Sequence, residues 1–372
     1  MLHPRLTSVD GTQTLWLASI GPYGAWGDLS YRTRWGDGAC GMYEASWTMP
    51  LPADFDHSIL RRGTLVELMD GPYRVGGPLV MSEPTVGSGL DEPWTITCTG
   101  VGRDVEGDHS FYARDGSGNS TAIPSTAMDQ NIADGWRVTR GASVPTGAIG
   151  GSATTDELMT TGSLLNAAAE SLSQRWGVGQ DGAVFFAADP TTPTYHVTPG
   201  SVALGTSDDG YATVVLGRYL DSATSTYKTV TATAANVQTL FGRKEYPANL
   251  IGMGAISTAT AQGFVDGILA RTKGRLAWTN SLTLTSNELL TAGGVPADLS
   301  KVVEDVGAGC MVLVHGIWSD LLEFNGATYL DIIIGEAQVV DGGQAVTLSP
   351  LGMTAYDFAK VIEEVTGFKE SA

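Results

Sequence analysis

The alternation of apolar and polar residues predicts mostly β structure in the first 110 residues. The clearest run is Trp94–Thr99, where Trp94, Ile96 and Cys98 alternate with threonines, a period of two that is typical of a strand with one buried face. Similar runs span 14–17, 43–49, 64–69 and 73–75. The turn signal Asp70-Gly71-Pro72 separates the last two of these runs and predicts a hairpin.

A repeat of about four residues predicts the first long helix. Thr154 and Glu157 have the spacing of a capping box, and the apolar stripe that follows comprises Leu164, Ala168, Leu172 and Trp176. We therefore predict a helix that begins after Thr154 and ends at Gly177. A tight turn at Asp181-Gly182 should then lead into a strand over 183–186.

The rest of the chain predicts strands with three further helices. Strands are expected within 195–245, over 310–315 and 329–334, and in a hairpin that turns at 341–343. The helices are expected after the cap Ser257, near 299–306, and from Thr354 to Gly367. The apolar face of the helix after Ser257 comprises Ala261, Phe264, Val265, Ile268 and Leu269.

Two distant segments, 61–104 and 307–352, share a pattern. In each, a glycine (Gly63 or Gly309) precedes a strand, a second strand precedes a glycine-containing bend (Gly76-Gly77 or Gly335), and a final threonine-bearing strand ends at a glycine. The pattern has two interpretations. Either the segments are duplicates, or they show only the likeness of any two antiparallel meanders.

Composition and charge narrow the class of protein. The 372 residues suggest two or three domains, and 48 glycines fit a turn-rich β protein. The net charge of −19 argues against sequence-specific binding of DNA or RNA, although solubility alone accounts for it and DNA can still slide past an acidic wall. No apolar run is long enough for a membrane helix, and the N-terminus lacks a signal-peptide pattern, so we expect a cytoplasmically made, non-secreted protein without stable membrane insertion.

The sequence predicts no catalytic, cofactor or metal site. Cys40, Cys98 and Cys310 are spaced as buried apolar residues, and the five histidines (His3, His57, His109, His196 and His315) are scattered singly. The segment Gly177–Gly182 matches GxGxxG, but it has a helix before it and a strand after it, which favours a hairpin over a dinucleotide site. Asp115–Asn119 lacks the glycine and glutamate of a calcium loop and is interpreted as a flexible loop.

The sequence leaves open two kinds of interaction with carbohydrates, hydrolysis and binding. Short-spaced acid pairs such as Asp208 and Asp209 neither show nor exclude a glycosidase site. Trp94, Trp176 and Trp318 are interpreted as core residues. The tryptophans that lie among glycines and aspartates are the candidates for glycan contact: Trp26, Trp35 and Trp136.

Several runs beyond Gly151 resemble minor tail proteins of long-tailed phages of actinobacteria. They are 176–191, 205–211, the helix that ends at Leu269, 278–284 and 293–299. The resemblance implies a tail hub, a homotrimer in which each subunit carries two related β-barrel-like tube domains. Three chains would then form a pseudo-sixfold ring between the tail tube and the tip.

We therefore expect a mainly β chain with a few helices (α+β), with two tube-type domains and helix-bearing middle domains. The expected segments are 1–110 (tube-type), 111–150 (polar linker), 151–250 (middle α+β), 251–304 (helical connection) and 305–372 (second tube-type domain with a C-terminal helix). The functional hypothesis is a non-enzymatic virion protein at the tail tip that contacts other tail proteins and forms part of the DNA channel. The alternatives are a distal tail protein ring and a carbohydrate-active or receptor-binding tail protein.

Overall fold

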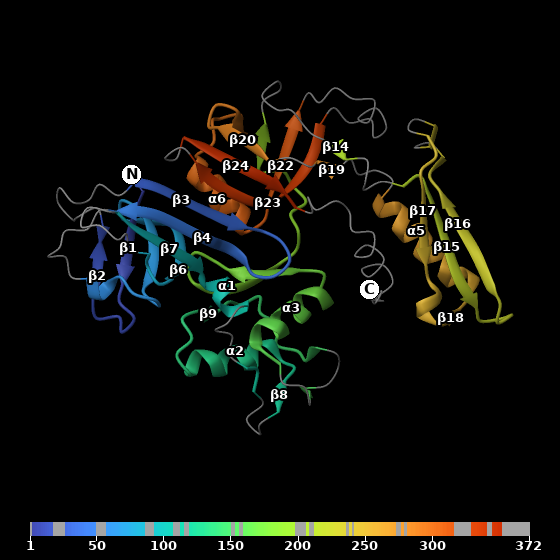
Figure 1. Cartoon of the computed structure of the whole chain (residues 1–372), viewed down its shortest axis with the longest axis horizontal. Helices are drawn as coiled ribbons and strands as arrows, with labels where there is room; N and C mark the ends of the chain where they lie inside the picture. Colours follow the sequence, from blue (N-terminus) through green and yellow to red (C-terminus); the bar gives the residue numbers. More distant parts are fainter. Residues whose placement is uncertain are drawn as a thin grey trace. The chain divides into compact units, whose positions relative to one another are not determined.

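The structure, a computed structural model, divides into two compact units, each described here by itself (Figure 1). Unit 1 comprises 1–201, 281–315 and 331–351, and unit 2 comprises 202–280, 316–330 and 352–372. The residues that the structure describes are 2–17, 27–49, 57–85, 93–106, 112–114, 119–149, 153–155, 159–197, 206–207, 212–235, 238–239, 242–272, 277–278, 281–315, 329–340 and 344–351. Because these units are defined by contacts and not by chain order, the five consecutive segments expected from the sequence stay a prediction.

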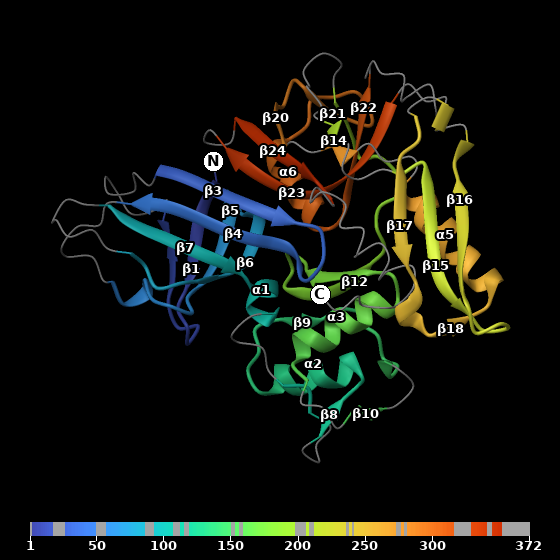
Figure 2. The ribbon, with the colours of Figure 1, turned by 45° about the vertical axis from the view of Figure 1, so that its right-hand side comes forward.

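The predicted fold class, mainly β with a few helices, is confirmed. Unit 1 is built on one sixteen-stranded sheet, whose main path runs β2-β1-β5-β6-β7-β4-β3-β23-β22-β13-β21 (Figure 2). Its strands are β1 (Leu2–Thr7), β2 (Thr14–Trp16), β3 (Gly27–Arg34), β4 (Cys40–Met49), β5 (Leu65–Asp70), β6 (Tyr73–Met81), β7 (Trp94–Gly100), β9 (Thr139–Arg140), β11 (Arg175–Val178), β12 (Ala183–Ala187), β13 (Tyr195–Val197), β20 (Leu282–Thr285), β21 (Leu289–Thr291), β22 (Cys310–His315), β23 (Tyr329–Val340) and β24 (Ala345–Pro350).

Short helices cover parts of this sheet. They are η3 (His57–Ile59), α1 (Val101–Glu106), α2 (Pro124–Ala133), α3 (Thr161–Ser171) and α6 (Leu299–Gly307), beside a small ribbon of β8 (Ser120–Thr121) and β10 (Thr154–Thr155). Leu165 of α3, Val105 of α1 and Trp176 of β11 meet in one buried cluster. Burial of such side chains stabilises the fold by about 1.5–3 kcal/mol each, so this cluster anchors the helices to the sheet.

The first predicted helix was placed wrongly. Thr154 does not cap a helix but pairs with Thr121 in the β8–β10 ribbon, and the cap is Thr160, whose Oγ1 accepts a hydrogen bond from the Ser163 backbone N–H at 3.1 Å. The helix ends at Ser171, and Ser173 adopts a left-handed φ of 52°. Trp176 therefore belongs to β11, because the four-residue apolar repeat runs on into a strand.

The other predicted elements in the described residues are confirmed. Asp70 pairs with Tyr73 in the β5–β6 hairpin, and Val178 pairs with Val184 around a turn in which Gly182 has a φ of 78°. The segment Gly177–Gly182 is thus a hairpin between strands, as predicted. The hairpin between β23 and β24 pairs Val340 with Ala345, while its turn at 341–343 and the helix expected from Thr354 lie outside the described residues.

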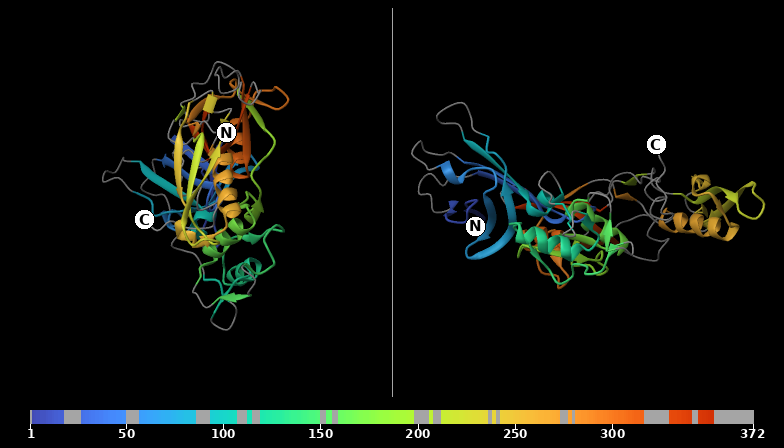
Figure 3. Two further views of the ribbon diagram at one scale, coloured as in Figure 1. Left: turned by 90° about the vertical axis from the view of Figure 1, so that its right-hand side faces the viewer. Right: turned by 90° about the horizontal axis from the view of Figure 1, so that it is seen from below.

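Unit 2 is a small sheet with one helix on it (Figure 3). Its strands are β15 (Val214–Asp221), β16 (Tyr227–Thr233), β17 (Glu245–Asn249) and β18 (Ala255–Ile256), with η6 (Ile251–Met253) between the last two and a separate pair of β14 (Thr206–Ser207) and β19 (Ala277–Trp278). Helix α5 (Thr258–Thr272) begins after the predicted cap Ser257, whose Oγ accepts from the Thr260 backbone N–H at 3.1 Å. The helix approaches the sheet closely because Gly217 has no side chain: a Cβ there would lie 2.4 Å from Val265 Cγ1.

No described helix has the length and apolarity that crossing a bilayer requires.

Candidate functional site

Reactive chemistry is scarce in the described part of the chain. No three His, Cys, Asp or Glu residues there are grouped so that they could hold a metal ion. The three cysteines are free and buried, as predicted. Burial raises the pKa of Cys40 to about 11 and that of Cys310 to about 12, and it also raises the pKa of Cys98. The thiols therefore stay protonated at neutral pH, which makes them poor nucleophiles.

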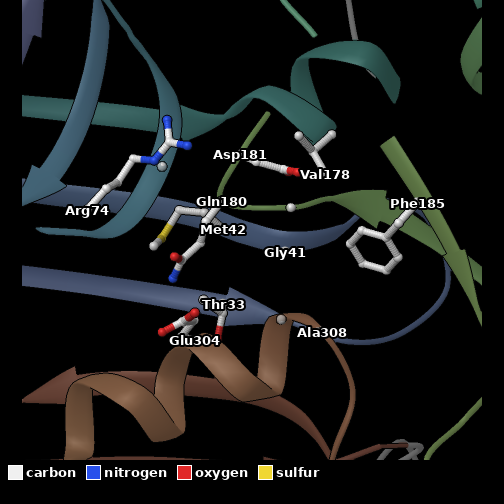
Figure 4. Close-up of a pocket in the computed structure, with 13 residues that line it drawn as sticks. Thr33, Gly41, Met42, Arg74, Val178, Gln180, Asp181, Phe185, Glu304 and Ala308 are labelled. Atoms are coloured by element: carbon white, nitrogen blue, oxygen red, sulfur yellow. The ribbon is translucent and has the colours of Figure 1, made fainter. Parts of the chain in front are cut away.

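A cavity of unit 1 has a volume of about 480 Å³ (Figure 4). Arg74 and Met42 lie on one side of it, Glu304 projects from α6, and Gln180 and Asp181 come from the β11–β12 hairpin. Gly41 allows the hairpin to approach, because a Cβ there would lie 2.3 Å from the Val178 carbonyl oxygen. The remaining lining residues are Thr33, Gly77, Val178, Gly179, Phe185, Gly307 and Ala308.

The polar side chains of this cavity already bind protein partners. Arg74 Nη1 pairs with Glu67 Oε1 at 2.6 Å, and Glu304 Oε1 pairs with Lys301 Nζ at 2.9 Å. Gln180 Nε2 donates to the Val75 carbonyl at 3.1 Å, and Asp181 Oδ1 accepts from the Ala183 N–H at 2.9 Å. The cavity is therefore a packed junction of strands, helix and hairpin, and none of its lining residues is a His, Ser or Cys.

Two groups of five strands in unit 1 share one spatial order. Module A has the spatial order β1-β5-β6-β7-β4, and module B has the order β13-β22-β23-β24-β20. In each module the first strand in space is also first in the chain, the last in space is second, and a three-strand meander completes the set. The same order of five strands thus occurs twice, which fits duplication, one of the two interpretations that the sequence leaves open.

Local details of the two modules also correspond. A helical turn precedes the meander in each, η3 in module A and α6 in module B. Gly63 and Gly309 then enter the first meander strand with φ values of 89° and 97°. Each middle strand has a glycine-containing bulge, near Gly77 in β6 and at Gly335 in β23, and β6 has a second register shift at Val75.

Strand β3 joins the modules into one continuous sheet, because it pairs with β4 of module A and β23 of module B. A register row across six neighbouring strands carries only polar side chains, each of them half-buried or exposed. We name this row the polar face: Thr283, Thr347, Gln338, Arg32, Glu44 and Thr99. The alternate residues of these strands, such as Leu284, Val346 and Ala45, point to the core.

The charges on the polar face are matched. Arg32 Nη2 binds Glu44 Oε2 at 2.6 Å, and Arg32 Nη1 lies 3.3 Å from Glu336 Oε1. The hydroxyls of Thr283 and Thr347 lie 3.0 Å apart, and Gln338 Nε2 donates to Ser30 Oγ at 2.9 Å. The six side chains of the face are thus hydroxyl and amide groups with one arginine–glutamate ion pair, while Arg34 and Arg103 lie near Arg32 around the Tyr43 ring.

Two tryptophans that the sequence predicted to be exposed, Trp35 and Trp136, are buried in the structure. Trp35 is fully buried, and its Nε1 donates to Asp189 Oδ1 at 2.8 Å, while Trp136 is 9% exposed. Core packing at these two sites precludes sugar stacking. Trp176 is in the core as predicted, and Trp94 is partly buried. Trp26, Trp318, the acid pair 208–209 and residues 115–118 lie outside the described residues.

Comparison with known proteins links this fold to phage tails. No protein-family model and no curated protein matches the chain. Among solved structures, the 43 kDa tail protein of prophage MuSo2 from Shewanella oneidensis is 12% identical, with a TM-score of 0.54 over 95% of this chain and 100% of that one. This chain has the fold of a phage tail protein. Two more distant matches are a tail protein from Neisseria meningitidis (10% identity, TM-score 0.49, 94% and 96% coverage) and the prophage tail protein gp18 from Listeria monocytogenes (10%, 0.47, 98% and 98%).

Within this tail-protein fold, sequence reasoning missed one juxtaposition. His196 and His315 are 119 residues apart in the chain, and the structure places His196 Nδ1 2.8 Å from His315 Nε2. The spacing of residues along the chain cannot reveal a pair that forms only when distant strands lie side by side. The signals that were present are that His315 ends the apolar run 310–314 and that His196 lies between Tyr195 and Val197. His57 and His109 add nothing here, because neither side chain is among those described.

Proposed function

We propose that the chain is a structural protein of a phage tail, the hub at the tail tip. The observation that carries the proposal is the repeated five-strand module within one continuous sheet. A chain that presents two similar modules lets three copies build six similar positions, so a threefold ring fits a hexameric tube. The shared fold with a prophage tail protein supports the same assignment.

The polar face gives this hub a surface suited to a DNA channel. A duplex that moves through a tube needs walls without unpaired cations, because each lysine or arginine that contacts phosphate retards it. The neutral Thr and Gln residues of the face, with Arg32 held by Glu44 and Glu336, meet that need. We infer that this face lines the channel and that the opposite, apolar face forms the core.

The proposed role is assembly without catalysis, in the virion, with other tail proteins as partners. The buried thiols and the protein-bound polar groups of the cavity support it. We expect a homotrimer because the sequence resembles actinobacterial tail hubs.

Light scattering coupled to size exclusion tests the proposal. We expect the full chain to form a trimer, and negative-stain class averages of that trimer to show six peripheral densities around a central hole. A hexamer would instead favour a distal tail ring. A chain that stays monomeric at high concentration, and that releases sugar from cell walls, would overturn the hub assignment.

A further inference from the structure

Three arginine side chains of unit 1 gather around a single tyrosine ring. The guanidinium carbons of Arg32, Arg34 and Arg103 lie 4.8, 5.5 and 4.8 Å from the centroid of the Tyr43 ring. Arg32 and Arg34 belong to β3, Arg103 to α1 and Tyr43 to β4. We name these four residues the arginine cluster. Any two of the guanidinium groups lie within about 10 Å, one Debye length at about 0.1 M salt, so they repel one another.

A β-bulge explains why Tyr43 lies on the same side of the sheet as the arginines. Tyr43 is the residue of β4 that the register with β3 skips, and its side chain is half-buried. Arg32 and Arg34 alternate with the buried Thr33, so both point to one face of the sheet. Because Arg32 is part of the polar face, the arginine cluster lies at the polar face.

The cluster contains more cations than ion-paired carboxylates. Arg32 pairs with Glu44 and Glu336, at 2.6 and 3.3 Å. The side chain of Arg103 is 47% exposed, and its Nη1 lies 3.9 Å from Glu44 Oε2, which is longer than a charge-assisted hydrogen bond of about 2.7–2.9 Å. Arg34 donates to a backbone carbonyl at 2.6 Å and forms no ion pair with any described residue. Two carboxylates thus serve three guanidinium groups.

A third acid nearby does not complete the balance. Glu106 Oε1 accepts a hydrogen bond from the Ala39 backbone N–H at 2.7 Å. Burial raises the pKa of the Glu106 carboxyl above its ordinary value. Within the described part of the chain, Glu106 forms no ion pair with Arg34 or Arg103. The remaining donors of these two arginines are therefore available to a ligand from outside the chain.

An acidic protein surface fits the cluster better than nucleic acid does. The net charge of −19 repels a duplex at long range, and one surplus arginine releases few counterions. Two copies of this chain also repel each other unless the surfaces that meet carry opposite charge. A cationic cluster on one copy that meets carboxylates elsewhere on the next gives a head-to-tail contact, the kind of contact that closes into a ring.

We propose that the arginine cluster is a subunit interface that binds carboxylate side chains of a second copy of this chain. The planar forks of Arg34 and Arg103 suit bidentate binding of a carboxylate, and the Tyr43 ring holds the guanidinium groups in place. Such a contact also neutralises cations that a passing duplex would otherwise meet at the polar face. The inference rests on the proposed homotrimer and adds the residues that hold its copies together.

Sedimentation equilibrium of the full chain tests the interface. We expect the double variant Arg34→Gln/Arg103→Gln to weaken trimer formation by about tenfold or more, and the loss to shrink at high salt, which screens the wild-type contact. Arg34→Lys/Arg103→Lys keeps the charges without the planar forks and should fall between the two. The control is Arg140→Gln, which removes an arginine paired with Asp129 and should leave association unchanged.

The outcomes separate this inference from the hub proposal. A wild-type trimer that the double variant forms equally well would overturn the interface and leave the hub standing. A wild-type chain that stays monomeric would overturn both. Fluorescence anisotropy with a labelled DNA duplex covers the other anion: duplex binding by the wild type that the double variant loses would identify phosphate as the ligand and overturn the carboxylate assignment. Far-UV circular dichroism and equal melting temperatures verify that the variants are folded.

Discussion

Modules A and B share a strand order but are stabilised by different interactions. In module A, Glu67 on β5 accepts from Arg5 on β1 (2.7 Å to Nε) and from Arg74 on β6 (2.6 Å), which links three strands by charge. In module B, hydroxyl pairs link the β20 region to β24: Ser281, just before β20, with Ser349, and Thr283 with Thr347. The order of strands is thus preserved while the chemistry that holds them differs.

The first strands of the two modules also differ in direction. β1 runs antiparallel to β5, whereas β13 runs parallel to β22. The central meander has the same strand order in both modules, whereas the direction of the first strand differs. The part that the two modules share is therefore the meander, β5–β7 in module A and β22–β24 in module B.

Trp35 lies where the two modules meet. It directly follows β3, its backbone N–H donates to the Gly335 carbonyl at 2.7 Å, and a Cβ on Gly309 would lie 3.1 Å from its ring. It therefore contacts both glycines that define module B, the junction before β22 and the bulge of β23. A substitution of Trp35 therefore tests directly whether this junction stabilises the two modules.

The largest expected effect is that of Trp35→Ala. Removal of a fully buried indole should lower the free energy of unfolding by about 3–5 kcal/mol, because a cavity remains and Asp189 loses a donor. Urea unfolding followed by circular dichroism measures the loss. The control is Tyr73→Ala, which removes a side chain that is 75% exposed and should change stability by less than about 0.5 kcal/mol. Equal effects of the two variants would show that the packing of Trp35 between the modules does not stabilise the protein.

The paired glycines allow a matched test. Alanine at Gly63 or Gly309 must adopt a left-handed φ, which costs on the order of 1–3 kcal/mol. At Gly309 the new methyl group also presses on the Trp35 ring, whereas at Gly63 it meets Val9 Cγ2 at an ordinary 3.4 Å. We therefore expect Gly309→Ala to destabilise more than Gly63→Ala in parallel urea titrations. The reverse order would contradict the close packing assigned to module B.

The ionised Glu67 carboxylate should make the stability of module A depend on pH. Burial raises the pKa of Glu67, but the hydrogen bonds and charges of Arg5 and Arg74 outweigh it and leave the pKa below its ordinary value. A depressed folded-state pKa stabilises the protein above the unfolded pKa of about 4.3, and this stabilisation is lost as pH falls through the folded value. Glu67→Gln should therefore cost about 1 kcal/mol near neutral pH and flatten the loss of stability below about pH 4.

Hydrogen exchange at low pH measures the same effect region by region. In the wild type, β5 and β6 should gain exchange at acid pH before β22 and β24, because the described contacts of those module B strands include no such carboxylate. Glu170→Gln, on the exposed side of α3, serves as the control and should leave the acid response unchanged. Equal acid sensitivity of both modules would show that Glu67 does not distinguish them.

The sequence predicted strands and glycine positions well because both follow from local chemistry. The period of two placed β7, the turn signals placed the β5–β6 and β11–β12 hairpins, and the self-similarity marked Gly63 and Gly309, which both adopt left-handed φ. The helix predicted at Thr154 failed because two caps compete within seven residues, and only the pairing of Thr154 with Thr121, 33 positions away, decides between them.

Contacts distant in sequence were inaccessible. Glycine and aspartate around Trp35 suggested exposure, yet Asp189, 154 residues away, supplies the partner that lets the indole be buried. The His196–His315 pair and the polar face arise in the same way, from the register between strands that are far apart in the chain. Their positions depend on topology, which periodicity alone does not contain.

The smallest expected effect is on the polar face. Thr283→Val and Thr347→Val keep the side-chain shape and the β propensity while removing exposed hydroxyls that lie 3.0 Å apart. Each should change the free energy of unfolding by less than about 0.5 kcal/mol, and a double-mutant cycle should show coupling of similar size. A coupling above about 1 kcal/mol would mean that the hydroxyl pairs hold module B together as charge holds module A. A small coupling would mean that these hydroxyls contribute little to folding, as we expect if the polar face lines the proposed DNA channel.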